Sequence, residues 1–119
     1  MEKRATVAGL FRNAKETRKV EAGAVIFDEG DAGVEMFGIL DGEVELRVKG
    51  GVLDRLGPDE VFGEMALIDN SLRSNTAVAV TDTTLATIDR HRFLFLVQET
   101  PMFALDVMGV MAERLRNRS

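Results

Sequence analysis

The chain of 119 residues has no cysteine, no tryptophan and no tyrosine, and it contains only one histidine. A chain without cysteine forms no disulfide, no zinc–thiolate site and no cysteine nucleophile. One histidine is too few for the histidine cluster that a cupin-type metalloenzyme needs. We therefore predict that the protein is not an enzyme and that it holds neither a metal ion nor a cofactor.

Long hydrophobic runs are also missing. No apolar stretch approaches the ~20 residues that a membrane-spanning helix needs, and residues 1–19 lack the apolar core of a secretion signal. The net charge of -5 argues against a general affinity for nucleic acid or anionic membrane, because such binding needs a basic face. The one basic cluster, Arg114, Arg116 and Arg118, is interpreted as complementing the dipole of a last helix. We expect a cytoplasmic protein with no direct nucleic-acid or membrane partner.

The composition that is present is globular, with 45% hydrophobic and 29% charged residues. The length fits one domain with one modest core. We expect a single domain over residues 1–119. It would comprise an N-terminal lead-in (1–16), a β-roll (17–89) and two C-terminal helices (90–118).

Short alternating segments separated by glycine fill residues 17–89, a pattern typical of an antiparallel sandwich or barrel. Val44, Leu46 and Val48 alternate with charged residues, which predicts a strand that buries one face. The dipeptide Asp41-Gly42 suits the two-residue turn of a β-hairpin just before that strand.

Helical patterns appear in three places. Residues 63–69 suit one or two helical turns, Asp89 is the predicted N-cap of a short helix, and Thr100-Pro101 begins a second helix that reaches about Arg118. The predicted buried stripe of this last helix consists of Ala104, Leu105, Met108, Met111, Ala112 and Leu115. The predicted fold is mainly β with flanking α: an antiparallel β-roll of jelly-roll type, with a short internal helix and two C-terminal helices.

The segment FGEMALIDNSLRSNTAVAV, which begins at Phe62, places charged residues in otherwise apolar surroundings. Gly63 permits close backbone approach, and the amides of Met65 and Ala66 would be unpaired in the first helical turn, which suits an anion. Arg73 adds a planar fork suited to phosphate, and Ser74 adds a hydroxyl donor. The segment therefore predicts a phosphate cradle.

Glu64 would repel a bare phosphate, but its carboxylate can accept a hydrogen bond from a ribose hydroxyl beside the phosphate. A flat base would lie against apolar residues, for which the candidates are Leu46, Leu53 and Phe62. Phosphate, ribose and base together indicate a nucleotide.

These residues resemble a known family. FGEMAL, the spacing from Glu64 to Arg73 and the segment RSNTAVA look like the phosphate-binding cassette of cyclic nucleotide-binding domains. These domains are the sensors of catabolite-activator-type regulators and of protein kinase A regulatory subunits. The resemblance also covers AGAVIFDEGD, GILDGEVEL and the two closing helices, from about Lys19 to Arg118.

The resemblance implies a role for each matching position of the cassette (residues 62–76). Gly63 and Glu64 would bind the ribose, and the cyclic phosphate would be bound by Arg73, Ser74, Met65, Ala66 and Asn75. The helix from Pro101 would be a lid over the base, and Arg118 lies where the family has base-capping residues.

Two positions depart from the family pattern. Leu72 stands where the family often has proline, and Asn75 stands where it usually has alanine. Asn75 would either donate a further hydrogen bond to the phosphate or crowd the site.

Two functional hypotheses follow. In the first, a cyclic nucleotide, cAMP before cGMP, binds the roll and the last helix signals to a separate partner protein. In the second, the fold has lost its ligand and serves as a protein-interaction or weak dimerisation domain. Arg73 would then be part of a structural ion pair with Glu64 or Asp69, and His91 would be solvated under either hypothesis.

Overall fold

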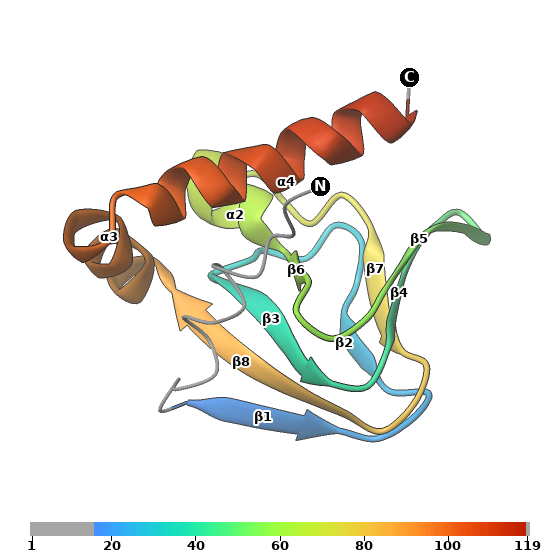
Figure 1. Ribbon diagram of the computed structural model, residues 1–119. Coiled ribbons are helices and arrows are strands. Elements are labelled where there is room, and N and C mark those ends of the chain that lie inside the picture. Colours follow the sequence, from blue (N-terminus) through green and yellow to red (C-terminus); the bar gives the residue numbers. More distant parts are fainter. Residues whose placement is uncertain (1–15, 119) are drawn as a thin grey trace.

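The computed structural model describes residues 16–118, with the side chains of residues 16–116. The predicted lead-in therefore lies, apart from Glu16, outside the described residues. The strands are β1 (Thr17–Val20), β2 (Val25–Phe27), β3 (Glu35–Asp41), β4 (Val44–Val48), β5 (Gly51–Leu56), β6 (Val61–Phe62), β7 (Thr76–Ala79) and β8 (Thr83–Asp89) (Figure 1). The helices are α2 (Glu64–Asp69), α3 (Arg90–Glu99) and α4 (Met102–Arg118).

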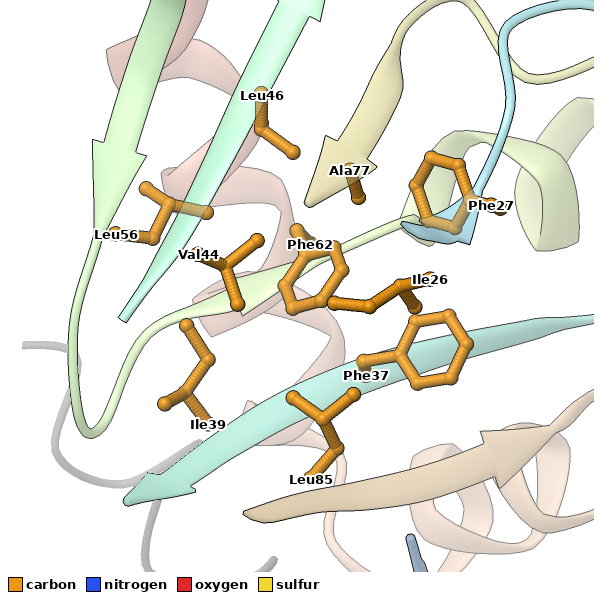
Figure 2. Close-up of a cluster of buried hydrophobic side chains, with 10 residues drawn as sticks. All are labelled: Ile26, Phe27, Phe37, Ile39, Val44, Leu46, Leu56, Phe62, Ala77 and Leu85. Carbon is orange, nitrogen blue, oxygen red and sulfur yellow. The ribbon is translucent and has the colours of Figure 1, made fainter. Parts of the chain in front are cut away.

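The described strands form two four-stranded antiparallel sheets, in the orders β1-β8-β3-β6 and β2-β7-β4-β5. Apolar side chains from both sheets meet between them, because alternate residues of each strand point to the same face. Figure 2 shows this cluster, which contains Ile26, Phe27, Phe37, Ile39, Val44, Leu46, Leu56, Phe62, Ala77 and Leu85. The arrangement is the β-roll expected from the sequence.

The hairpin predicted at Asp41-Gly42 is wrong. β3 pairs with β6 and β8, whereas β4 pairs with β5 and β7, so this turn carries the chain from one sheet to the other. The tight hairpin joins β4 to β5 through Lys49 and Gly50, which both have positive φ, at 45° and 80°. A type I′ turn requires positive φ at both central residues. Asparagine, aspartate and glycine are the usual residues at the first of these positions, so the lysine found there does not indicate a turn.

Strand β4 also differs from its predicted one-sided burial. Val44 and Leu46 belong to the core as expected, but Glu45 is buried as well. Arg55, its cross-strand neighbour, and Arg47, two residues along the same strand, both donate to its carboxylate. The two arginines therefore cover a carboxylate that alternation alone would leave in water.

Helices α3 and α4 begin as predicted. The Asp89 carboxylate accepts from the amide of Arg92 at 2.8 Å, as an N-cap does, and the Thr100 carbonyl accepts from the amide of Phe103 at 2.8 Å. His91 is exposed at the start of α3.

The buried face of α4 is not the predicted stripe. Phe103, Val107 and Val110 are buried at 0%, 1% and 7% exposure, whereas Met108 and Leu115 are 53% and 66% exposed. The helix carries apolar residues on more than one face, so periodicity alone does not identify the face that packs. On the buried face the Phe103 ring packs edge-on against Phe93 of α3, with centroids 5.3 Å apart.

Helix α4 lies across the end of the roll that contains α2 (Figure 1). Beneath it a second buried cluster joins Phe103 and Val107 to Leu67 of α2 and to Met36 and Ile88 of the β1-β8-β3-β6 sheet. This packing brings the C-terminal half of α4 over the cassette.

Candidate functional site

A pocket of about 160 Å³ lies between the cassette and α4. The cassette contributes Gly63, Glu64, Met65, Ala66, Leu72, Arg73, Ser74 and Asn75 to its lining. The remaining lining residues are Phe27 and Leu46 from the roll, and Met111, Arg114 and Leu115 from α4. Segments far apart in the sequence thus enclose one space.

The side chain of Arg73 is held in this pocket by hydrogen bonds and by a ring contact. Its guanidinium donates from Nη1 to the carbonyl of Gly63 at 2.9 Å and from Nη2 to the carbonyl of Glu35 at 2.6 Å. Its Cζ lies 4.1 Å from the centroid of the Phe27 ring, a cation–π contact. The side chain is therefore fixed in place by three different segments of the chain.

The electrostatic environment of Arg73 is unusual. The residue is only 7% exposed, and burial lowers the pKa of its guanidinium, an effect that the charges of Glu35, Glu64 and Asp31 oppose. Its Nε is buried and has no hydrogen-bond partner among the described residues. A buried cation without a bonded anion is costly, so the site is electrostatically suited to a negative ligand.

Arg73 does not form the structural ion pair considered above. Its bonded partners are two carbonyl groups, and the carboxylate of Asp69 instead accepts from the amide of Ser71 at 3.0 Å. Hydrogen bonds from the side chain and the amide of Ser71 lower the pKa of Asp69.

Glu64 is paired with an arginine that comes from α4. Nη1 of Arg114 donates to both carboxylate oxygens of Glu64, at 3.2 and 3.3 Å, and Nη2 donates to the carbonyl of Val61. The side chains are 5% and 12% exposed, so this is a largely buried ion pair between the cassette and the last helix. Arg114 therefore has a specific partner in the cassette, which its interpretation as one of a basic cluster at the helix end does not include.

The structure brings most of the predicted site residues together. The predicted phosphate and ribose residues all line the pocket, and Leu46 lines it from β4. Leu53 lies on β5, is 37% exposed and does not line the pocket. Phe62 is fully buried, with its ring 5.2 Å from that of Phe37, and does not line it either. The side chain of Arg118 lies outside the described residues.

Sequence reasoning missed five pocket residues: Phe27, Leu72, Met111, Arg114 and Leu115. The sequence pattern assigns Met111 and Leu115 to a buried stripe and gives Phe27 no role of its own. One sequence feature could have indicated that these residues belong together. Arg114 follows Met111 by three residues, so the two are neighbours on one face of the helix.

Residues 16–118 contain neither a membrane-spanning helix nor a metal-binding cluster. No single helix among them is long and apolar enough to cross a membrane, and α3 and α4 reach the required length only as a pair bent by 117°. The same residues contain no group of three or more histidine, cysteine, aspartate or glutamate residues placed to hold a metal ion.

Comparison with known proteins identifies relatives of this site. Residues 17–100 match the family model of the cyclic nucleotide-binding domain. The cyclic AMP receptor protein of Thermus thermophilus is 39% identical over 106 residues, which are 85% of this chain and 49% of that protein. The lysophospholipase NTE1 of Chaetomium globosum is 35% identical over 108 residues, which are 87% of this chain and 7% of that enzyme.

Solved structures show the same fold. The catabolite activator protein of Thermus thermophilus superposes with a TM-score of 0.80 at 36% identity, covering 95% of this chain and 54% of that one. The EAL enzyme Bd1971 has been solved with cAMP bound (TM-score 0.67, 34% identity, 87% of this chain and 29% of that one). It has also been solved with cGMP bound (TM-score 0.68, 35% identity, 85% and 28%).

These comparisons confirm the predicted fold class and the family resemblance. The chain spans about half of the Thermus receptor and a small part of the fungal enzyme.

Proposed function

This chain belongs to the cyclic nucleotide-binding domain family, and we propose that its pocket binds a cyclic nucleotide and reports binding to a separate partner protein through α4. The observation that carries the proposal is the convergence of Glu64, Arg73 and Ser74 on one pocket that α4 closes. We propose no catalytic step for this domain.

In the proposed complex the cyclic phosphate lies against Arg73, Ser74 and Asn75 and the amides of Met65 and Ala66. An anion there would supply the negative partner that the buried Arg73 guanidinium lacks. The charge-assisted bonds formed would be stronger than the bonds of Arg73 to neutral carbonyl groups.

The ribose lies against Gly63 and Glu64. Because Arg114 contacts Glu64 through Nη1 only, the carboxylate keeps lone pairs that can accept from a ribose hydroxyl. In this arrangement Glu64 would bond ribose and α4 at the same time, which connects the ligand to the helix.

The base lies in the apolar part of the pocket, formed by Phe27, Leu46, Leu72, Met111 and Leu115. We propose that these five residues contact the base in place of Leu53 and Phe62, which do not line the pocket. Guanine carries a ring carbonyl and a ring N–H that adenine lacks, and a polar group buried without a partner costs about 1–3 kcal/mol. We therefore propose that cAMP binds more tightly than cGMP, by about tenfold or more.

For a partner protein to sense the ligand, ligand binding must change the equilibrium between two positions of α4. A ligand does this only if its affinities for the two states of the domain differ. Met111, Arg114 and Leu115 place α4 in direct contact with the pocket. The partner would bind one position of α4 better than the other, and we expect this to take place in the cytoplasm.

Thermal unfolding with added nucleotides tests the proposal. The protein is first unfolded and refolded to remove any bound ligand. Excess cAMP at about 100 times its dissociation constant should stabilise the fold by about 2.7 kcal/mol. 5′-AMP, which carries an open phosphate of greater charge, is the control and should stabilise it much less. Equal stabilisation by both nucleotides would contradict recognition of the cyclic phosphate.

A second candidate function rests on the exposed apolar side of α4. Leu105, Met108 and Leu115 are each more than half exposed, with spacings of three and seven residues that place them on one side of the helix. A weak homodimer or a constitutive protein contact through this side is the alternative to ligand-dependent signalling. Sedimentation of the chain beside its Met108→Glu variant tests it: a concentration-dependent dimer that the variant abolishes supports this candidate, and monomers in both argue against it.

A further inference from the structure

The loop between β2 and β3 (residues 28–34) is attached to the backbone of Arg73. The amide of Gly30 donates to the Arg73 carbonyl at 2.8 Å, and the Arg73 amide donates to the carbonyl of Asp31 at 2.8 Å. Ala32 and Leu72 continue this contact as an antiparallel bridge. The loop and the arginine segment of the cassette thus lie side by side, although about forty residues separate them.

Gly33 occupies the closest point of this contact. A Cβ atom at Gly33 would lie 2.5 Å from both Cζ and Nε of Arg73, and 2.6 Å from the Cβ of Ala66. Carbon atoms in van der Waals contact are about 3.5–4.0 Å apart, so no other residue fits without a shift of the guanidinium or of α2. Gly33 has no positive φ, so the close approach and not the backbone conformation requires glycine here.

Gly33 and Phe27 together confine the Arg73 guanidinium. The Phe27 ring centroid is 4.1 Å from Cζ, and Gly33 approaches the same Cζ and the neighbouring Nε. The carbonyls of Gly63 and Glu35 fix the two Nη atoms. Each Nη then keeps one N–H that can donate to a ligand, whereas Nε is buried against the Gly33 side.

We propose that Gly33 is a positioning residue for the phosphate: its missing side chain allows the Arg73 guanidinium to lie in the one orientation that leaves these donors available to the pocket. This inference rests on the proposed function for its ligand, but it concerns a loop outside the cassette. The same residue sets the distance between this loop and Ala66, so it also aligns the start of α2 with Arg73.

The test is the affinity for cAMP of the Gly33→Ala and Gly57→Ala variants and of the parent chain. It is measured by calorimetry after each protein has been unfolded and refolded to remove bound ligand. Gly57 is the matched control, because it has no positive φ and a Cβ there would meet nothing within 4 Å. Gly33→Ala should weaken binding at least tenfold, and Gly57→Ala should leave it within twofold of the parent chain. Equal affinities in the two variants would overturn the proposal.

Two further variants separate positioning from general damage. The double variant Gly33→Ala/Ala66→Gly removes the clash of the new Cβ with Ala66 and keeps only its clash with Arg73. This variant should fold, and it should still bind cAMP at least tenfold more weakly than Ala66→Gly alone. In an Arg73→Ala background, Gly33→Ala should add no further loss of affinity, because it acts through Arg73. An undiminished loss in that background would show that Gly33 supports the whole pocket, and failure of both Gly33 variants to fold would assign it to packing alone.

A measurement without ligand tests the same geometry even if the parent chain binds no nucleotide. The Nε–H of Arg73 is buried and should give a slowly exchanging nuclear magnetic resonance signal, assigned by its loss in Arg73→Ala. Gly33→Ala should shift this signal and accelerate its exchange, and Gly57→Ala should not. An unmoved signal would refute the positioning role, whereas absent nucleotide binding with a shifted signal would refute only the proposed function.

Discussion

The carboxylate of Glu64 and the guanidinium of Arg114 lie 3.2 Å apart, although fifty residues separate them in the chain. Glu64 begins the short helix of the cassette, and Arg114 lies near the end of α4. Arg114 also donates to the carbonyl of Val61, so a single side chain joins α4 to both sides of Gly63. The proposed ligand site and the proposed output helix therefore share one ion pair.

Arg114→Ala should destabilise the fold by about 3 kcal/mol, because it leaves the buried Glu64 carboxylate without its charge partner. Urea unfolding of the stripped protein measures this change. Arg116→Ala is the matched control, since Arg116 is exposed on the same helix, and it should change stability by less than about 0.5 kcal/mol. Similar losses in both variants would mean that the pair with Glu64 contributes nothing specific.

Glu64→Gln should weaken binding of cAMP more than binding of 2′-deoxy-cAMP. The substitution removes a charged acceptor from the proposed bond with the ribose 2′-hydroxyl, and the deoxy ligand does not make that bond. A bond to a charged group contributes about 1.5–3 kcal/mol, so the two losses should differ about tenfold in affinity. Calorimetric titration with both ligands decides this, and equal losses would remove Glu64 from the ribose site.

Arg73→Ala should reduce cAMP affinity by about 2 kcal/mol or more, which is over tenfold, while the fold is largely kept. Some stability will also be lost, because the carbonyls of Gly63 and Glu35 lose a donor and Phe27 loses its stacked cation. Arg47→Ala removes the same charge from a half-exposed side chain outside the pocket and should leave the affinity unchanged. A chain that keeps full affinity without Arg73 would contradict its assignment to the phosphate.

The stability of the fold should depend on pH through Glu45. Hydrogen bonds from Arg55 and then from Arg47 hold the pKa of Glu45 below its ordinary value of 4.5. A carboxylate with a lowered pKa stabilises the fold above the pKa of the unfolded chain, and this contribution disappears as pH falls through the lower folded pKa. The difference in unfolding free energy between the parent chain and Glu45→Gln should therefore be largest at neutral pH and shrink below pH 4.5.

Urea unfolding at several pH values measures this difference. Glu99→Gln, an exposed change at the end of α3, is the control and should show a much smaller dependence. A constant difference between the parent chain and Glu45→Gln across this range would contradict the account of the Glu45 cluster.

The cassette could be predicted from the sequence because its residues are nearly contiguous. Glycine, glutamate, arginine and serine recur at short, fixed spacings within residues 62–76, and a short pattern is enough to recognise such a set. The caps at Asp89 and Thr100 were predictable for the same reason, since a cap depends on its next few residues.

Long-range relationships could not be predicted in this way. The turn at Asp41-Gly42 has suitable hairpin residues, but sheet pairing depends on what the later strands β7 and β8 offer as partners. The partner of Glu64 could not be predicted because α4 has apolar residues on opposite sides, and packing against α2, α3 and the sheet determines which side is buried. The role of Gly33 was hidden too, because the closeness of two segments about forty residues apart has no local signature.

Isothermal titration of the refolded, ligand-free protein with cAMP and cGMP tests the central claim most directly. The method suits a chain without tryptophan or tyrosine, whose intrinsic fluorescence is weak. The account predicts saturable binding of cAMP at micromolar or tighter affinity, about 8 kcal/mol or more, and weaker binding of cGMP. A folded protein that releases no heat with either nucleotide and gains no thermal stability from them would contradict it, and would leave the exposed side of α4 as the functional surface.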